Sequence, residues 1–104
     1  MREYTLHAGK VPEYLTLYER EGLSIQREIL GQMVGYYSTE VGPAINQVVH
    51  LWAYDSFDER ARRRARLAGD PGWQSYVQKM RPMLVAQCNR LLKPASFFEA
   101  ELRT

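Results

Sequence analysis

The sequence predicts a single α+β domain in which helices cover one face of an antiparallel sheet. Three observations predict this class. The chain has 104 residues, close to the usual size of one domain, and 45% of them are apolar, which suffices for one core. Short β-favouring runs alternate with longer segments that have the period of amphipathic helices. A Gly-Pro turn joins two of the β-favouring runs over a short distance.

The first half of the chain predicts a strand, a helix and a β-hairpin. Pro12 suits the first turn of a helix, and Gly22 should kink that helix or divide it in two. The short turn at Gly42 and Pro43 predicts that the strands on either side pair in antiparallel fashion. The expected segments are strand 2–8, helix 12–29, strand 33–40 and strand 45–54.

The second half predicts two helices and a last strand. Ser56 and Glu59 have the spacing of a capping box, and Asp70 before Pro71 is typical of a second helix start. Pro94 would place the last strand at an edge of the sheet or in a bulge. The expected segments are a helix over 56–68 closed by Gly69, a helix from Pro71 to about Pro82, and a strand within 89–98. The resulting order, β-α-β-β-α-α-β, is the ferredoxin-like pattern.

Composition argues against several classes of protein. A net charge of +2 does not indicate a nucleic-acid binder, and no apolar run is long enough to cross a membrane. The charged start of the chain is unlike a signal peptide. The single cysteine, Cys88, excludes an internal disulfide and favours the cytoplasm. His7 and His50 are the only histidines, and motifs for metals or nucleotides are missing, so we expect no metal and no cofactor.

The third strand has two different faces. Alternation assigns Gln47, Val49, Leu51 and Ala53 to one face, and Asn46, Val48, His50, Trp52 and Tyr54 to the other. The domain's own helices can cover only one side of the sheet. We therefore expect the other side to meet a second copy of the chain in a homodimer, since two-fold symmetry is the commonest form of assembly.

Several stretches of the sequence resemble the NIPSNAP family. They are REYTL at 2–6, GKVPEYLTLYE at 9–19, TEVGPAINQVVHLWAY at 39–54 and DERARRRA at 58–65. The resemblance covers nearly the whole chain, so residues 1–104 are identified as one NIPSNAP-like domain. It implies a dimeric α/β barrel, in which two ferredoxin-like units join through their sheets. The wider superfamily includes cofactor-independent oxygenases and haem-degrading oxygenases, whereas the NIPSNAP family has no settled biochemical activity.

The resemblance also implies a cavity between sheet and helices, lined by a tryptophan at the position of Trp52. Alternation then places His50 and Tyr54 in the same cavity, where His50 could be a general base or a hydrogen-bond donor. Arg2 and Tyr4 share a strand face and join this site if that face looks inward. The alternative is a packed core in which His50 only satisfies a buried partner.

The arginine-rich segment 60–66 offers a second candidate group. A helical wheel puts Arg64 inside the inward arc, with Arg60 and Leu67 at its edge. The rest of the inward arc would be Phe57, Ala61, Ala65 and Ala68, and the outward side would be Arg62, Arg63 and Arg66. Two alternatives stay open for the inward arginines. Glu40 pairs with Arg64 or Arg60 in a structural ion pair, or a guanidinium stays free to hold a carboxylate or enolate oxygen.

Two classes of function follow, and the sequence does not decide whether the protein is an enzyme. The first is a dimer that binds a small aromatic ligand, with cofactor-independent, oxygenase-like activity on an aromatic or enolisable substrate. There His50 or a tyrosine would accept a proton, Trp52 would form a wall, and Arg64 would stabilise negative charge. The second is a non-catalytic binding or scaffold homodimer whose pocket is filled by its own side chains.

Overall fold

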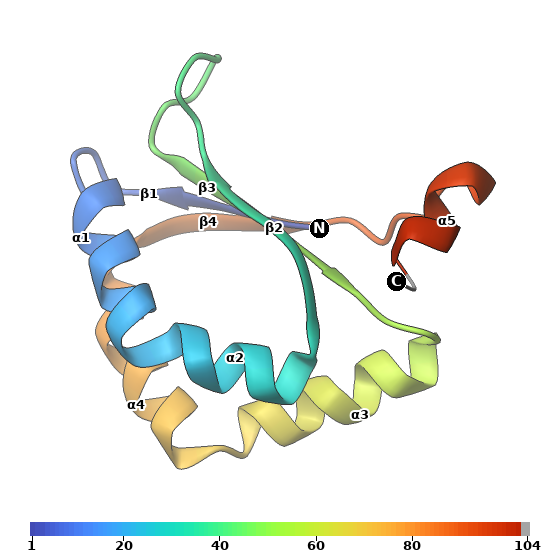
Figure 1. The fold of residues 1–104 in the computed structure, drawn as a ribbon. Coiled ribbons are helices and arrows are strands. Elements are labelled where there is room, and N and C mark those ends of the chain that lie inside the picture. The colour runs from blue at the N-terminus through green and yellow to red at the C-terminus, as the bar shows by residue number, and fades with distance from the viewer. Residues whose placement is uncertain (103–104) are drawn as a thin grey trace.

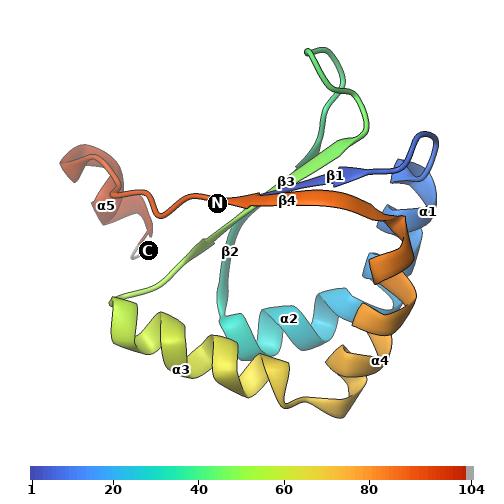
Figure 2. The same ribbon diagram turned by 180° about the vertical axis from the view of Figure 1, so that it is seen from behind.

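The computed structural model describes residues 1–102 and shows one antiparallel sheet with four helices on a single side of it (Figure 1, Figure 2). The strands are β1 (Arg2–Leu6), β2 (Gln32–Ser38), β3 (Gln47–Ala53) and β4 (Leu84–Asn89). The helices on the sheet are α1 (Val11–Leu17), α2 (Leu23–Leu30), α3 (Phe57–Ala68) and α4 (Pro71–Met80). The strand order is β2-β3-β1-β4, with every neighbouring pair antiparallel. The predicted ferredoxin-like α+β fold is therefore confirmed.

The first helical segment is interrupted at Gly22, as the sequence predicted. A π-helical turn, Tyr18–Gly22, separates α1 from α2. A side chain at position 22 would press on two tyrosine rings, because a Cβ there would lie 3.0 Å from Tyr18 Cδ1 and 3.2 Å from the ring of Tyr76. Glycine thus lets α4 approach this turn closely. A single π turn of this kind is common beside functional sites.

The two helices of the second half begin at the predicted caps. Ser56 Oγ accepts from the backbone N–H of Glu59 at 3.1 Å, and Asp70 Oδ1 accepts from the N–H of Trp73 at 2.9 Å. The reciprocal contact of the box is shifted by one residue, since Glu59 Oε2 accepts from the N–H of Asp55. These contacts satisfy backbone donors that a helix start leaves without partners. Both predicted helix starts are confirmed.

The prediction for the last strand was wrong. β4 covers Leu84–Asn89, directly after a 3-10 turn at Arg81–Met83, and Pro94 lies in the connection that follows. Residues Ser96–Leu102 form an additional helix, α5, which extends beyond the end of the sheet (Figure 1). Cys88 lies in β4 and is exposed. No helix within residues 1–102 is long and apolar enough to cross a bilayer.

The prediction for the inward face of α3 was also wrong. Phe57 is 74% exposed, and the alanines on its side of the helix are exposed too. Leu67 is the buried residue of α3, and it packs on Ile29 and Leu30 of α2. Arg63, expected to point to solvent, donates from Nη1 to the backbone oxygen of Ile29 at 3.1 Å. The helix is therefore rotated so that Leu67 and several arginines face the rest of the domain.

The main core between sheet and helices is rich in tyrosine. Its fully buried members are Tyr4, Leu6, Tyr14, Leu17, Tyr18, Val48, Tyr76, Met80 and Met83. A smaller cluster under α3 joins Leu67 to α2, with Trp52 and Tyr54 at its border. The aromatic residues of the third strand thus stand between two regions of core. This position makes the helix side of β3 the place to look for a site.

Candidate functional site

The helix side of the sheet brings four predicted residues together. Arg2 of β1 and His50 of β3 are direct cross-strand partners, so their side chains leave the sheet on one face. Tyr4 lies one row further along β1 and is buried on that face. Trp52 follows His50 by two residues and shares its side. The register therefore meets the condition that the sequence left open, since Arg2 and Tyr4 lie on the same side of the sheet as His50.

His50 is held as a neutral hydrogen-bond donor. It is 1% exposed, and its Nδ1 accepts from Trp52 Nε1 at 2.8 Å. A neutral imidazole carries one proton, so this proton lies on Nε2. Burial, reinforced by the positive charges of Arg2, the amino terminus and Arg64, lowers the pKa of His50 to about 3. The ring is therefore uncharged at neutral pH.

The Nε2–H of His50 is buried and has no acceptor among residues 1–102. The ring stacks on Tyr36 with centroids 4.7 Å apart, and it meets the ring of Tyr4 edge to face at 5.0 Å. A buried donor without a partner carries a cost in free energy, and such groups frequently mark a site that a water or ligand completes. Of the two roles considered for His50, this geometry favours the donor over the general base.

The surrounding tyrosines form a network of protonated phenols. The hydroxyl groups of Tyr14 and Tyr36 lie 2.6 Å apart, and Tyr18 donates to Gln26 Oε1 at 2.5 Å. Burial raises the pKa of Tyr14, Tyr18, Tyr36 and Tyr76 well above the ordinary value of a phenol. These four hydroxyls cannot act as ionised bases near neutral pH. They shape and rigidify the wall behind His50.

Arg2 is fixed beside Tyr4 without losing its charge. Its Nε donates to the Tyr4 hydroxyl at 3.3 Å, and its Nη2 donates to Gln87 Oε1 at 3.2 Å. The guanidinium carbon also lies 5.7 Å from the centre of the Tyr4 ring. Both acceptors are neutral. They orient the guanidinium, and no carboxylate of the described residues forms an ion pair with it.

Arg64 reaches the same region from α3. Burial lowers its pKa, and the like charges of Arg2 and Arg60 act in the same direction, while Tyr54 opposes them. Arg64 therefore lies within electrostatic reach of the other two arginines and of Tyr54. Neither Arg60 nor Arg64 forms an ion pair in the part of the chain that the structure describes.

The predicted ion pair between Glu40 and these arginines is absent from residues 1–102. Glu40 is exposed in the loop between β2 and β3. The carboxylate that does contact an arginine of α3 is Glu59, whose Oε1 accepts from Arg63 Nε at 2.8 Å. The prediction was wrong because the loop carries Glu40 away from the sheet's helix side. Within residues 1–102, Arg60 and Arg64 have no carboxylate partner.

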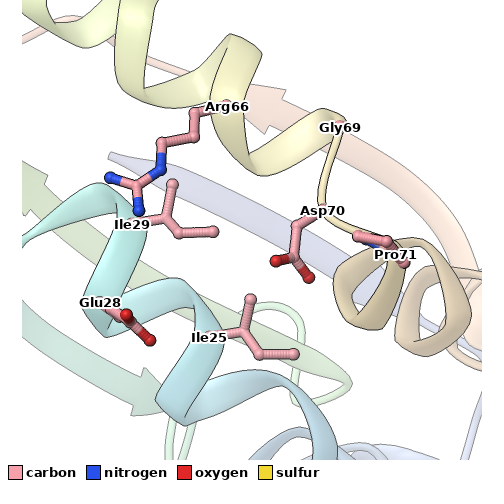
Figure 3. A pocket seen from close by; sticks show the side chains of 7 residues that line it. All are labelled: Ile25, Glu28, Ile29, Arg66, Gly69, Asp70 and Pro71. Atoms are coloured by element: carbon pink, nitrogen blue, oxygen red, sulfur yellow. The ribbon is translucent and has the colours of Figure 1, made fainter.

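Among the cavities within residues 1–102, two border α2 or α3, and neither is lined by His50, Trp52 or Arg64. One, of about 310 Å³, separates α2 from the turn between α3 and α4, where Arg66 extends toward Ile29 (Figure 3). It contains no residue predicted for the site. The other, of about 550 Å³, opens between the ends of β2 and β3, α3 and α5, with Tyr54 in its wall. Tyr54 thus borders this cavity and acts electrostatically on Arg64.

Sequence reasoning missed two contributors to this arrangement. Gln26 is 3% exposed and receives the hydroxyl of Tyr18 across the π turn. Gln26 follows Tyr18 by eight residues, and the sequence alone did not indicate a contact between them. The contact became evident only with the π turn at Tyr18–Gly22. Arg63 was assigned to solvent, yet it joins α3 to the last carbonyls of α2. The assignment was wrong because the helical wheel was oriented by Phe57 and the alanines, which put Arg63 on the outward side.

Comparisons with known proteins agree with the fold and identify the family. The sequence profile of the NIPSNAP family matches residues 1–99. The human protein NipSnap homolog 3A is 38% identical over 73 residues, which are 70% of this chain and 29% of that protein. The chain thus spans under a third of that relative's length.

Solved structures show the same likeness over most of the chain. A NIPSNAP family protein of unknown function from Agrobacterium tumefaciens is 48% identical, with a TM-score of 0.89, covering 92% of this chain and 86% of that one. An uncharacterized NIPSNAP-like domain protein from Burkholderia xenovorans has the same identity and TM-score, covering 92% of this chain and 83% of its own. The family match, the sequence identity and the shared fold lead to one conclusion: this chain belongs to the NIPSNAP family.

Proposed function

We propose that this NIPSNAP domain binds a small planar aromatic or enolisable ligand and stabilises its anionic form. One observation carries the proposal: the buried Nε2–H of His50 has no acceptor within residues 1–102, and the positive charge of Arg64 acts on the same ring. A phenolate or enolate oxygen would accept a hydrogen bond from His50 Nε2–H and would also pair with the positive charge of Arg64. Trp52 and Tyr54 provide aromatic walls for a planar ligand.

The chemistry that this arrangement supports is stabilisation of charge. His50 uses its basic nitrogen to accept from Trp52, and the buried tyrosines stay protonated. A ligand must therefore lose its proton to solvent, and the site holds the resulting anion. An electron-rich enolate or phenolate is the form that an oxygenase-like reaction without a cofactor would consume, so the site is suited to activate such a substrate electrostatically.

A second candidate is a non-catalytic binding or scaffold dimer. One observation favours it: rings of Tyr4 and Tyr36 pack against His50 from two directions, as expected of a filled core. In this case the imidazole would only anchor the indole of Trp52. The two candidates differ in whether an added anion reaches the Nε2–H of His50.

The proposal includes a homodimer formed through the other face of the sheet. No helix of residues 1–102 covers that face (Figure 2). It carries Val49 and Leu51 of β3, both half-buried, and Tyr37 of β2, which is 59% exposed. A second copy would remove this apolar surface from water. We expect native mass spectrometry to read two subunits, and a single subunit at micromolar concentration would contradict this part of the proposal.

The ionisation of a bound phenol tests the proposed function. We expect 4-nitrophenol to bind and to ionise at lower pH than in water, because His50 and Arg64 stabilise the phenolate. Absorbance of the yellow phenolate across a pH series measures the shift. Arg64→Gln should remove most of it, whereas the matched variant Arg62→Gln, which changes an exposed arginine of the same helix, should retain it. An unshifted titration with wild-type protein would refute the proposal.

A further inference from the structure

An unbalanced group of positive charges lies beside the proposed site. Arg60 and Arg64 lie one turn apart on α3, and Arg2 of β1 is the cross-strand partner of His50. Arg2 and Arg60 each act on Arg64 as a like charge. Four cations of the described residues have carboxylate partners, namely Lys10, Arg20, Arg63 and Lys79. Within residues 1–102 no carboxylate pairs with Arg2, Arg60 or Arg64.

One of these three charges, that of Arg2, is held in place by hydrogen bonds. Two neutral acceptors, the Tyr4 hydroxyl and Gln87 Oε1, orient the guanidinium of Arg2. Arg64 is partly buried, which lowers its pKa and raises the cost of leaving it without an anion. Fixed, partly desolvated guanidinium groups attract carboxylates strongly and bind them in a bidentate manner.

The second, independent observation is the unpartnered donor in the same row of the sheet. His50 is the cross-strand partner of Arg2, it is 1% exposed, and its Nε2–H has no acceptor among the described residues. Three positive groups and one neutral donor exceed what a single phenolate oxygen can satisfy. A ligand with two anionic groups on a rigid planar frame would match both the charges and the aromatic walls.

We propose that the ligand of this site is a phenolic or enolic carboxylic acid, bound as a dianion. This inference rests on the proposed function and specifies its substrate class. The phenolate or enolate oxygen would accept from His50 Nε2–H near Arg64. The carboxylate would lie between Arg2 and Arg60, two charges that the proposed function does not use.

Two chromophoric probes that differ by one carboxylate test the inference. They are 4-nitrophenol and 5-hydroxy-2-nitrobenzoate, which is the same nitrophenol with a carboxylate meta to the hydroxyl group. We expect the carboxylate to tighten binding by at least about tenfold, measured as Kd by calorimetry. Arg2→Gln and Arg60→Gln should each remove most of this preference. Arg62→Gln, on the exposed side of α3, should keep it.

The outcomes separate the two proposals. Binding of 4-nitrophenol with a lowered phenol pKa, but no gain from the carboxylate, would overturn the dianion inference and leave the proposed function standing. Failure of both probes to bind would overturn both. A gain that persists in Arg2→Gln and Arg60→Gln alike would also overturn the assignment, because the carboxylate would then lie elsewhere. Circular dichroism of each variant checks that it is folded before binding is measured.

Discussion

Replacing Tyr14 with alanine is expected to lower the free energy of unfolding by about 3–5 kcal/mol. Tyr14 is 1% exposed, its ring contacts those of Tyr4 and Tyr18, and its hydroxyl lies 2.6 Å from that of Tyr36. Truncation would leave a cavity at the centre of the core that joins α1 to the sheet. Urea unfolding followed by far-ultraviolet circular dichroism measures the loss.

Tyr14→Phe is the matched control, because it keeps the ring and removes only the hydroxyl. We expect it to cost about 0.5–1.5 kcal/mol, the net value of one hydrogen bond. The difference between the two variants separates packing from the contact with Tyr36. Equal losses in both variants would show that the hydroxyl contact, and not the ring, dominates the contribution of Tyr14. That result would contradict the tyrosine core described above.

Acid is expected to destabilise the protein through His50. Its pKa is about 3 in the folded protein, against an ordinary value of 6.5. The folded-state pKa is the lower one, so the unfolded chain binds more protons between these values. The contribution of neutral His50 to the free energy of unfolding is therefore fully present above pH 6.5, and it is lost as the pH falls toward 3. At about 1.4 kcal/mol per pH unit, the loss reaches roughly 2–3 kcal/mol by pH 4.5.

Two variants isolate this effect from the titration of carboxylates. His50→Asn removes the titrating group and retains an oxygen that can accept from Trp52 Nε1. We expect its free energy of unfolding to fall less than that of the wild type between pH 7 and pH 4.5. His7→Asn changes an exposed histidine and should keep the wild-type dependence. A His50→Asn profile parallel to the wild type would contradict the assignment of a depressed pKa to His50.

Prediction of the fold succeeded where local chemistry is strong. The capping residues Ser56 and Asp70 and the interruption at Gly22 are each decided by a few neighbouring atoms. The last strand was misplaced because β4 lies at the sheet edge and carries no alternating pattern of burial. Of its residues only Leu84 is half-buried, and the others are exposed. The additional helix α5 buries none of its residues, and its seven residues, with Phe98 and Leu102 at helical spacing, make too short a pattern to predict a helix.

Prediction of the site likewise succeeded where the local pattern is strong and failed where it is weak. Strand alternation put Arg2 with Tyr4 on one face of the first strand, and His50 with Trp52 on one face of the third. It left open whether the two faces coincide, which the pairing of Arg2 with His50 decides. The orientation of α3 was not predictable from its alanines, since small side chains contribute little to burial. One leucine, Leu67, decides it by packing on α2. Glu40 was wrongly paired because it lies in a loop, and the periodicity of a sequence does not predict the path of a loop.

The central claim is that a neutral His50 presents its Nε2–H to an anionic ligand. Nuclear magnetic resonance of protein labelled with ¹⁵N in its histidine rings tests this claim most directly. We predict that His50 stays in the Nε2-protonated neutral form from about pH 8 to pH 5, and that its Nε2–H resonance shifts on saturation with 4-nitrophenolate. An imidazole that becomes charged within this range, or an Nε2–H signal that the ligand leaves unchanged, would contradict the account.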